Sequence, residues 1–389
     1  MNKIDKLIDE LCPDGVMFKE LSKVAKIETG KLNANAAIED GKYLFFTTAK
    51  EISKIDTYRW DTEALLIAGN ANVGDVKHYK GKFEAYQRTY VLTNFTNDTN
   101  VRYLYHVLDA NLKRYLDNKS NKAAMTYIVL STIKEFPIPL PPLPVQEEIV
   151  RILDNFTELT AELTAELTAR KQQYEYYRDE LLTFGDEVEW KTLGEIGTIE
   201  RGNGLKKSDF LDEGFPCIHY GQIYTYYGLS ADETISFVSE ELAKKLKRVS
   251  TGDIIIAVTS ENLEDVCKPL VWLGGDDIVT GGHTAIFRHN QNPKYIGYYL
   301  QTYMFFKEKR KLAQGTKVIE VTPRKLENVK IPIPPLAEQE RIVSILDKFY
   351  ALVNDISIGL PAEIEARQKQ YEYYREKLLT FKELKAKEA

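Results

Sequence analysis

The chain has 389 residues, a formal net charge of −6 and a hydrophobic fraction of 43%. This length can hold two ordinary domains, each with its own core. The acidic charge argues against a uniformly basic nucleic-acid binder, although basic loops could still contact phosphate. The three cysteines follow no metal or disulfide spacing, which indicates a reducing cytoplasm. No apolar run approaches the roughly 18 residues of a membrane span, so we expect no membrane contact.

The first globular segment begins like a second segment that lies 172 residues later. The shared positions are Val16, Phe18, Leu21, Val24, Ile27 and Gly30, matched by Val188, Trp190, Leu193, Ile196, Ile199 and Gly202. Apolar β-type runs predict strands at 43–48, 64–68, 89–92, 254–258 and 284–287. Helical periodicity predicts helices at 101–116 and 295–306. The two segments therefore look like copies of one α/β scaffold that carry different loops.

Each segment ends in a proline-rich stretch that also occurs twice. Ile138-Pro139-Leu140-Pro141-Pro142-Leu143 recurs 193 residues later as Ile331-Pro332-Ile333-Pro334-Pro335-Leu336. Each copy is followed by a Gln-Glu pair, Gln146-Glu147 or Gln339-Glu340. Proline lacks the N–H that a helix needs and biases the residue before it toward extended backbone. A rigid lead-in followed by a helix start is therefore expected twice.

After each lead-in, apolar residues recur three and four positions apart, as in a helix–helix seam. A second shared block, at 173–184 and 370–381, has an offset of 197, so the second helical segment is four residues longer. The first helix contains a tandem Thr-Ala-Glu-Leu repeat, which is a stutter in the seam, and Gly359 and Pro361 should interrupt the second helix. The seam positions are Ile149, Ile152, Phe156, Leu159, Leu163, Leu167, Tyr174, Tyr177, Leu181, Ile342, Ile345, Phe349, Leu352, Tyr371, Tyr374 and Leu378.

No catalytic or metal-binding constellation emerges from the sequence. A phosphate-binding loop is missing, since the glycines around Gly202 lack the required spacing. Asn292-Pro293-Lys294-Tyr295 is similar to the Asn-Pro-Pro-Tyr of amino-methyltransferases but lacks the second proline. The five histidines show no ligand spacing. We therefore predict no catalytic residue, no metal and no cofactor in this chain.

Loop residues with amide, hydroxyl and basic side chains remain, and these suit phosphate contacts and base-edge readout. For any single one, the alternative is an ordinary solvated side chain, so the hypothesis rests on their clustering. In the first segment the candidates are Lys31, Thr48, Lys50, Arg59, Asn70, Asn72, Lys77, Lys80, Lys82, Gln87 and Arg88. In the second they are Arg201, Asn203, Lys206, Lys207, Tyr220, Gln222, Thr259, Asn262, His283 and Lys317.

The tandem layout, the Pro-Pro-Leu-x-x-Gln-Glu-x-Ile-Val lead-ins and the Thr-Ala-Glu-Leu repeat resemble the specificity subunit of type I restriction–modification enzymes. The resemblance covers essentially the whole chain. It implies an α+β fold of two similar α/β target recognition domains, joined by two long antiparallel helices in a coiled-coil spacer with pseudo-twofold symmetry. The expected segments are 1–140 for the first domain, 141–184 for the first lead-in and helix, 185–334 for the second domain and 335–389 for the second lead-in and helix.

The same resemblance implies a sequence-specific, non-catalytic DNA-binding subunit. Each domain would read one half of a split double-stranded DNA site, while the helices set the gap and dock two modification subunits. Those partners would bind S-adenosylmethionine and methylate adenine N6, and restriction or motor subunits would use ATP and Mg²⁺. Two other functions stay open, a cytoplasmic coiled-coil scaffold without DNA and a self-contained DNA-modifying enzyme. A steep salt dependence of DNA binding would separate the DNA-binding function from the scaffold.

Overall fold

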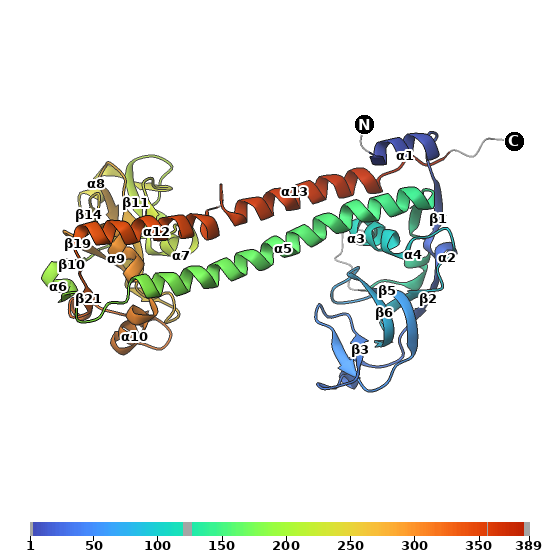
Figure 1. Ribbon diagram of the computed structural model, residues 1–389, viewed down its shortest axis with the longest axis horizontal. Helices are drawn as coiled ribbons and strands as arrows, with labels where there is room; N and C mark the ends of the chain where they lie inside the picture. Colours follow the sequence, from blue (N-terminus) through green and yellow to red (C-terminus); the bar gives the residue numbers. More distant parts are fainter. Residues whose placement is uncertain (1–2, 120–126, 356, 385–389) are drawn as a thin grey trace. The chain divides into compact units, whose positions relative to one another are not determined.

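A computed structural model describes residues 3–119, 127–355 and 357–384. The chain divides into two compact units, one made of Met1–Glu162 with Glu365–Ala389 and one made of Leu163–Ile364. Two of the long helices, α5 (Leu143–Leu181) and α13 (Leu360–Leu379), contribute residues to both units (Figure 1). Each unit has its own sheet and its own apolar core.

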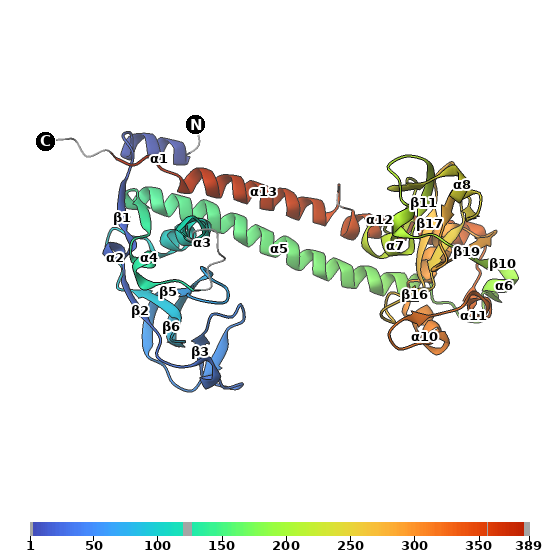
Figure 2. The same ribbon diagram turned by 180° about the vertical axis from the view of Figure 1, so that it is seen from behind.

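The first unit is built on a six-stranded sheet. Its order is β2 (Lys26–Thr29), β7 (Thr89–Thr93), β5 (Trp60–Ala68), β6 (Val76–Ala85), β3 (Tyr43–Phe46) and β4 (Ser53–Ile55). All neighbours are antiparallel except β3 and β6. The long helix α3 (Val101–Lys119) lies beside the first part of α5 in both views (Figures 1 and 2). Its apolar face joins β5, β7 and α5 in one core, as the helical periodicity predicts.

The beginning and end of this domain pair with each other. β1 (Met17–Glu20) runs antiparallel to β8 (Pro137–Leu140), with Phe18 opposite Pro139. The proline-rich lead-in is therefore an extended edge strand, which tolerates proline because one side needs no N–H partner. Short elements complete the unit: α1 (Lys3–Leu11), α2 (Leu21–Val24), the 3₁₀ turn η1 (Ala34–Ala36) and α4 (Leu130–Lys134).

The second unit repeats the same central strands. β10 (Gly197–Arg201), β19 (Thr284–His289), β15 (Ile254–Ala257), β17 (Lys268–Trp272) and β12 (Ser230–Ala231) form one sheet in that order. β9 (Trp190–Thr192) pairs with β21 (Lys330–Pro332), as β1 pairs with β8. Unlike the first unit, this one adds a four-stranded sheet of β13 (Ser236–Val238), β11 (Phe215–Ile218), β18 (Ile278–Thr280) and β14 (Lys247–Val249). The remaining elements are β16 (Thr259–Ser260), β20 (Ile319–Glu320), α6 (Leu193–Ile196), η2 (Lys207–Asp209), α7 (Tyr220–Thr225), α8 (Glu240–Ala243), α9 (Pro293–Tyr299), α10 (Tyr303–Leu312) and α11 (Pro323–Leu326).

The expectation of one helix at 295–306 is wrong, because the structure has two, α9 and α10. Thr302 caps the second helix: its hydroxyl accepts a hydrogen bond from the Phe305 N–H at 3.2 Å and donates one to the Tyr299 carbonyl at 2.7 Å. A threonine N-cap stabilises a new helix start. The corresponding residue in the first unit is Ala110, 192 positions earlier, and there α3 continues without a break.

The predicted interruption of the second long helix is confirmed. α12 (Leu336–Asn354) ends before a turn, and α13 begins at Leu360. A Cβ on Gly359 would lie 2.5 Å from the Ala351 carbonyl oxygen, so only glycine fits there. Pro361 sits in the first turn of α13, where proline is tolerated. The turn lies between the lead-in, which matches the first copy with an offset of 193, and the later shared block, which matches it with an offset of 197. The turn therefore accommodates the four extra residues of the second helical segment.

Each unit contains one pair of packed long helices. In the first unit, Phe156 of α5 stacks on Tyr374 of α13, with ring centroids 5.4 Å apart. In the second unit, Tyr177 of α5 stacks on Phe349 of α12 at 5.6 Å. Phe156 corresponds to Phe349, and Tyr177 corresponds to Tyr374, so one aromatic pair is made twice. Within the described residues no helix is long and apolar enough to cross a membrane.

Candidate functional site

A buried glutamine joins each domain to the start of its long helix. The Gln146 amide oxygen accepts a hydrogen bond from the Asn100 backbone N–H at 2.8 Å, and its nitrogen donates to the Pro141 carbonyl at 2.7 Å. In the second unit, Gln339 accepts from the Asn292 N–H at 3.0 Å and donates to the Pro334 carbonyl at 2.9 Å. Both glutamines are fully buried. The repeated Gln of the lead-in is therefore a polar contact that holds domain and helix together.

The asparagine in this contact also explains a motif that the sequence left ambiguous. Asn292 is the N-cap of α9, since its side chain accepts from the Tyr295 N–H at 3.2 Å, and Pro293 occupies the first helical turn. Asn100 accepts from the Tyr103 N–H at 3.1 Å in the same way. The residues 292–295 thus form a helix start, as the capping preference of asparagine explains.

A carboxylate farther along each long helix makes a second contact with its domain. Asp154 accepts hydrogen bonds from Arg102 at 2.9 Å and bonds the His106 ring at 2.8 Å. Burial would raise the Asp154 pKa, but these two hydrogen bonds outweigh it and hold that pKa below its ordinary value. Burial lowers the pKa of His106, which favours the neutral ring.

The equivalent carboxylate in the second unit, Asp347, has chemically different partners. Lys294 lies 2.9 Å from one of its oxygens, and the Tyr298 hydroxyl donates to the other at 2.7 Å. Lys294 and Tyr298 follow Arg102 and His106 by 192 residues. The two domains are therefore held on their helices by the same geometry, with a titratable histidine in only one of the two contacts.

Away from the long helices, the two domains share a set of backbone contacts just after the central strands β5 and β15. We call these contacts the loop frame. The Gly69 N–H donates to the Arg88 carbonyl at 2.9 Å, and the Val258 N–H donates to the His283 carbonyl at 3.0 Å. At the next residue, Asn70 forms an antiparallel β-bridge with Tyr127, and Thr259 pairs in the same way with Glu320. Arg88 and His283 thus occupy one position of the frame, and Asn70 and Thr259 occupy another. All four are among the predicted DNA-binding residues.

In the first unit, Arg88 and Gln87 line a pocket of about 280 Å³ with Gly69, Tyr90 and Ile128. Both side chains are exposed, and the Gln87 amide donates to Asn33 at 2.8 Å. The Arg88 guanidinium forms no hydrogen bond or ion pair with any other residue that the structure describes.

Three other predicted residues of this unit meet in a second cluster. Asn72 donates to the Thr48 carbonyl at 2.8 Å, and Lys77 donates to the neighbouring Ala49 carbonyl at 3.3 Å. Thr48 is buried, so its side chain is less available than the sequence indicated. Arg59 is held by the Thr29 carbonyl at 3.2 Å and lies over the Trp60 ring. Four more are exposed on the surface: Lys31, Lys50, Lys80 and Lys82.

In the second unit, four predicted residues, Tyr220, Thr259, Asn262 and His283, come together around a pocket of about 290 Å³. The His283 ring bonds the Thr259 hydroxyl at 2.9 Å and lies 4.7 Å from the Tyr220 ring. Glu261, Asp265, Ser260, Tyr224 and Val318 complete the lining. Burial raises the pKa of Tyr224, whose hydroxyl donates to the Thr259 carbonyl at 2.7 Å. The pocket is polar and aromatic, and two carboxylates lie at it.

The other predicted residues of this unit do not line this pocket. Some form hydrogen bonds within the unit, and the rest are exposed elsewhere on its surface. Gln222 accepts from the His219 N–H at 2.9 Å and donates to Ser236 at 2.6 Å, so it stabilises the start of α7. Arg201 donates to the Gly282 carbonyl at 2.9 Å and pairs with Glu320. Asn203 donates to the Lys245 carbonyl at 2.6 Å. Lys206, Lys207 and Lys317 are exposed.

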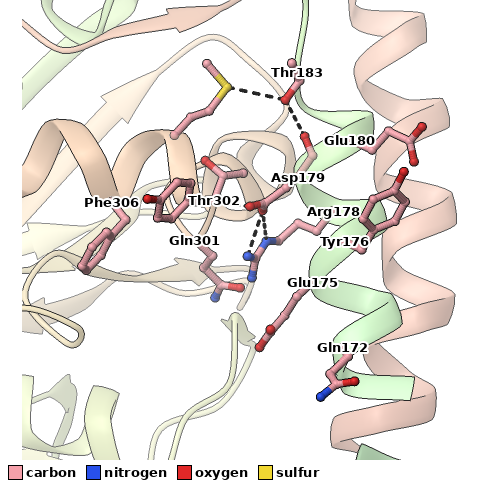
Figure 3. Close-up of a pocket in the computed structure, with 12 residues that line it drawn as sticks. Gln172, Glu175, Tyr176, Arg178, Asp179, Glu180, Thr183, Gln301, Thr302 and Phe306 are labelled. Carbon is pink, nitrogen blue, oxygen red and sulfur yellow. Dashed lines mark hydrogen bonds and ion pairs between the residues drawn. The ribbon is translucent and has the colours of Figure 1, made fainter. Parts of the chain in front are cut away.

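A third kind of feature is a groove between a long helix and a domain helix, which the described residues form in both units. The larger one, about 990 Å³, lies between the end of α5 and the start of α10 (Figure 3). Arg178 and Asp179 pair at its wall, and Tyr176 is 63% exposed. The equivalent groove of the first unit, about 370 Å³, is lined by α3 and α13 and includes Tyr373, also 63% exposed.

The predicted seam positions divide between buried and exposed places. Ile149, Leu163, Tyr174, Ile342 and Leu378 are buried, whereas Leu352 is 38% exposed and the adjacent Val353 is 1% exposed. The buried helix positions that sequence reasoning missed include Leu153 and Leu346, which are fully buried. They belong to the repeated Ile-Leu-Asp segments, so a second apolar face was present in the sequence. In each unit the leucine of this face belongs to the same buried apolar core as the domain.

Comparison with known protein families agrees with this two-domain organisation. The family described as "Type I restriction modification DNA specificity domain" matches residues 13–170 and 185–366. The chain belongs to this family. Two matches in one chain confirm the tandem of similar domains that the internal repeats predict.

Relatives extend the family match over nearly the whole chain. A putative type I restriction enzyme specificity subunit of Haemophilus influenzae is 36% identical over 386 residues, which covers 94% of this chain and 96% of the relative. A type I restriction enzyme specificity subunit of Escherichia coli is 39% identical over 297 residues, 73% of this chain and 72% of the relative. The S subunit structure from M. genitalium has a TM-score of 0.56 at 17% identity and covers 94% of this chain and 96% of that one. It supports the fold.

Proposed function

We propose that this chain is the DNA specificity subunit of a type I restriction–modification complex, in which each domain reads one half of a bipartite site. The observation that carries the proposal is the shared loop frame, present in both copies of a DNA specificity domain but bearing different side chains. One scaffold with two different loop sets suits two different half-sites. The family is a non-catalytic specificity subunit family, so the chemistry belongs to partner subunits.

We also propose the identity of those partners. Two modification subunits would bind S-adenosylmethionine and methylate adenine N6, and restriction or motor subunits would use ATP and Mg²⁺. The equivalent grooves of the two units support the number two, since a repeated surface can hold two copies of one partner. Exposed tyrosines are common anchors at protein interfaces. Tyr176 and Tyr373 are the proposed anchors.

The experiment that tests the proposed function is a loop exchange followed by methylome mapping. Residues 31–130 would be replaced with those of another family member, in a host that also carries the modification subunit. We expect one half-site of the methylated sequence to change while the other half-site and the gap stay the same. Changes in both half-sites would contradict independent reading by the two domains.

A salt titration separates this function from a DNA-free scaffold. Binding of the complex to a duplex carrying the mapped site should weaken steeply as salt rises, because phosphate contacts release counterions. The acidic chain alone should bind weakly until the partners join. If the chain assembles with its partner subunits but the complex does not bind DNA at low salt, the result would support the function of a DNA-free scaffold.

A further inference from the structure

The two domains differ in the hydrogen-bonding character of the groups at their shared loop frame. In the first unit the frame holds Arg88, and the described residues lining its pocket include no carboxylate. In the second unit the frame holds His283, and the pocket beside it includes Glu261 and Asp265 but no lysine or arginine among the described lining residues. The charged group of one pocket is therefore a donor, and the charged groups of the other are acceptors.

The free group in each pocket can be identified from the internal contacts. Asp265 is already engaged at one oxygen, which accepts a hydrogen bond from the Asn262 amide at 2.8 Å. His283 uses Nδ1 in its contact with Thr259. Glu261 is exposed and forms no hydrogen bond or ion pair with another described residue. At the two pockets, Glu261 and Arg88 are thus the charged side chains that form no hydrogen bond or ion pair with another described residue.

The chemistry of DNA restricts what each group can contact. A carboxylate repels phosphate, so Glu261 is suited to a base edge and not to the backbone. In the major groove, cytosine N4 and adenine N6 are amino donors that a carboxylate can accept from. Guanine presents O6 and N7, two acceptors that match the paired donors of a guanidinium.

We propose that the two domains read bases of opposite hydrogen-bonding character at the pockets beside their loop frames. Arg88 contacts a guanine in one half-site, and Glu261 contacts an amino-bearing base, cytosine or adenine, in the other. This inference rests on the proposed function, since it assumes that the loops face DNA. It adds the residues and the class of base at one position of each half-site.

Methylome mapping of single variants tests the inference in the complete complex. Arg88→Ala should lower discrimination at one guanine of the first half-site by about 10- to 100-fold, with the second half-site unchanged. Glu261→Ala should relax one cytosine or adenine position of the second half-site to the same extent. Glu261→Arg should shift that position toward guanine. Lys23→Ala and Glu241→Ala, substitutions in the same units outside the pockets, are the matched controls and should leave the sequence unchanged.

A base-substitution assay gives an independent readout. Replacing the implicated guanine with 7-deazaguanine removes the N7 acceptor, so it should weaken binding by the parent complex but not by the Arg88→Ala complex. If the parent recognises a bipartite site while both alanine variants keep its full sequence, the inference is overturned and the proposed function stands. If the parent recognises no bipartite site, both are overturned.

Discussion

At the scale of single residues, the contacts that hold each domain on its helix are the most informative feature of the molecule. Gln146 and Gln339 occupy equivalent buried positions and make the same pair of backbone hydrogen bonds. A leucine of similar size could fill the space but could not satisfy those backbone groups. Unpaired buried polar groups are costly, which gives a physical reason for glutamine in both lead-ins.

We predict that Gln146→Ala lowers the free energy of unfolding by about 2–4 kcal/mol, because it leaves backbone groups unpaired and opens a cavity. Gln339→Ala should have a similar effect. Denaturant unfolding followed by circular dichroism measures the change. Glu147→Ala and Glu340→Ala, which alter the exposed neighbours, should change stability by less than about 0.5 kcal/mol. Equal effects of the buried and exposed substitutions would contradict the role given to the glutamines.

His106 predicts a pH dependence that the second unit lacks at this position. Burial lowers its pKa in the folded state, so below the unfolded value of about 6.5 the unfolded chain binds more protons. The contribution of His106 to the free energy of unfolding is therefore complete above that pH and is lost as the pH falls. His106→Gln should reduce the loss of stability between pH 7 and 5, by at most about 1.4 kcal/mol per pH unit.

Chemical denaturation at several pH values measures this slope. Tyr298→Phe alters the equivalent position, where no group titrates near neutral pH, so its slope should match that of the parent chain. Other buried histidines, His219 and His289, contribute acid sensitivity of the same sign and are common to all three proteins. An unchanged slope in His106→Gln would show that this ring does not titrate differently on unfolding.

At the scale of elements, sequence periodicity predicted most of the scaffold but little of the structure that distinguishes the two domains. The strands at 64–68 and 254–258, the helix at 101–116 and the interruption near Gly359 are confirmed, because long apolar patterns and glycine or proline breaks are local signals. The four-stranded sheet of the second unit was not predicted. Its strands are only three or four residues long, so pairing with distant segments decides their structure.

The candidate site was predictable only in part, for a related reason. Sequence alone indicated that Tyr220, Thr259, Asn262 and His283 are polar loop residues, and the fold brings them together. It could not show that Gln222 and Arg201 are used in internal contacts, or that Glu261 lies at the pocket. Such contacts depend on side chains far apart in sequence, which no periodicity reports.

The repeated aromatic pairs give a prediction about helix packing. Tyr174 is buried and lies near Tyr350, and Tyr177 stacks on Phe349. Tyr174→Ala/Tyr177→Ala should lower stability by about 3–6 kcal/mol through lost burial and ring contacts. Thermal unfolding would detect this as a lower melting temperature. Tyr176→Ala, on the exposed side of the same helix, is the control: it should leave the melting temperature unchanged but weaken partner binding if the groove is a docking surface.

At the scale of the whole molecule, duplication with divergence connects fold to function. The chain repeats the lead-in strand, the glutamine and aspartate contacts, the loop frame and the groove, and it varies the side chains that the loops present. Repeating the frame keeps each domain in a defined geometry on its own helix. Varying the loops allows each half-site to change without altering that geometry, as a bipartite reader requires.

The Thr-Ala-Glu-Leu repeat predicts how the gap between half-sites is set. α5 continues without a break through both copies, and deletion of residues 164–167 would shorten it by about 6 Å and rotate the remainder of the helix by about 40°. DNA rises about 3.4 Å per base pair, so the full shift would approach two base pairs. The uncut partner helix must bend or slip to match the shortened one. We therefore expect the gap to shrink by one or two base pairs while both half-site sequences stay the same.

Methylome mapping of the deletion variant beside the parent chain measures the gap directly. The deletion also removes the stutter, so the seam should stay in register and the protein should still fold. Circular dichroism and partner binding establish that the variant is folded and assembled. A matched control replaces residues 164–167 with four alanines, which keeps the helix length and should keep the gap. An unchanged gap in a folded, active deletion variant would show that helix length does not set the spacing.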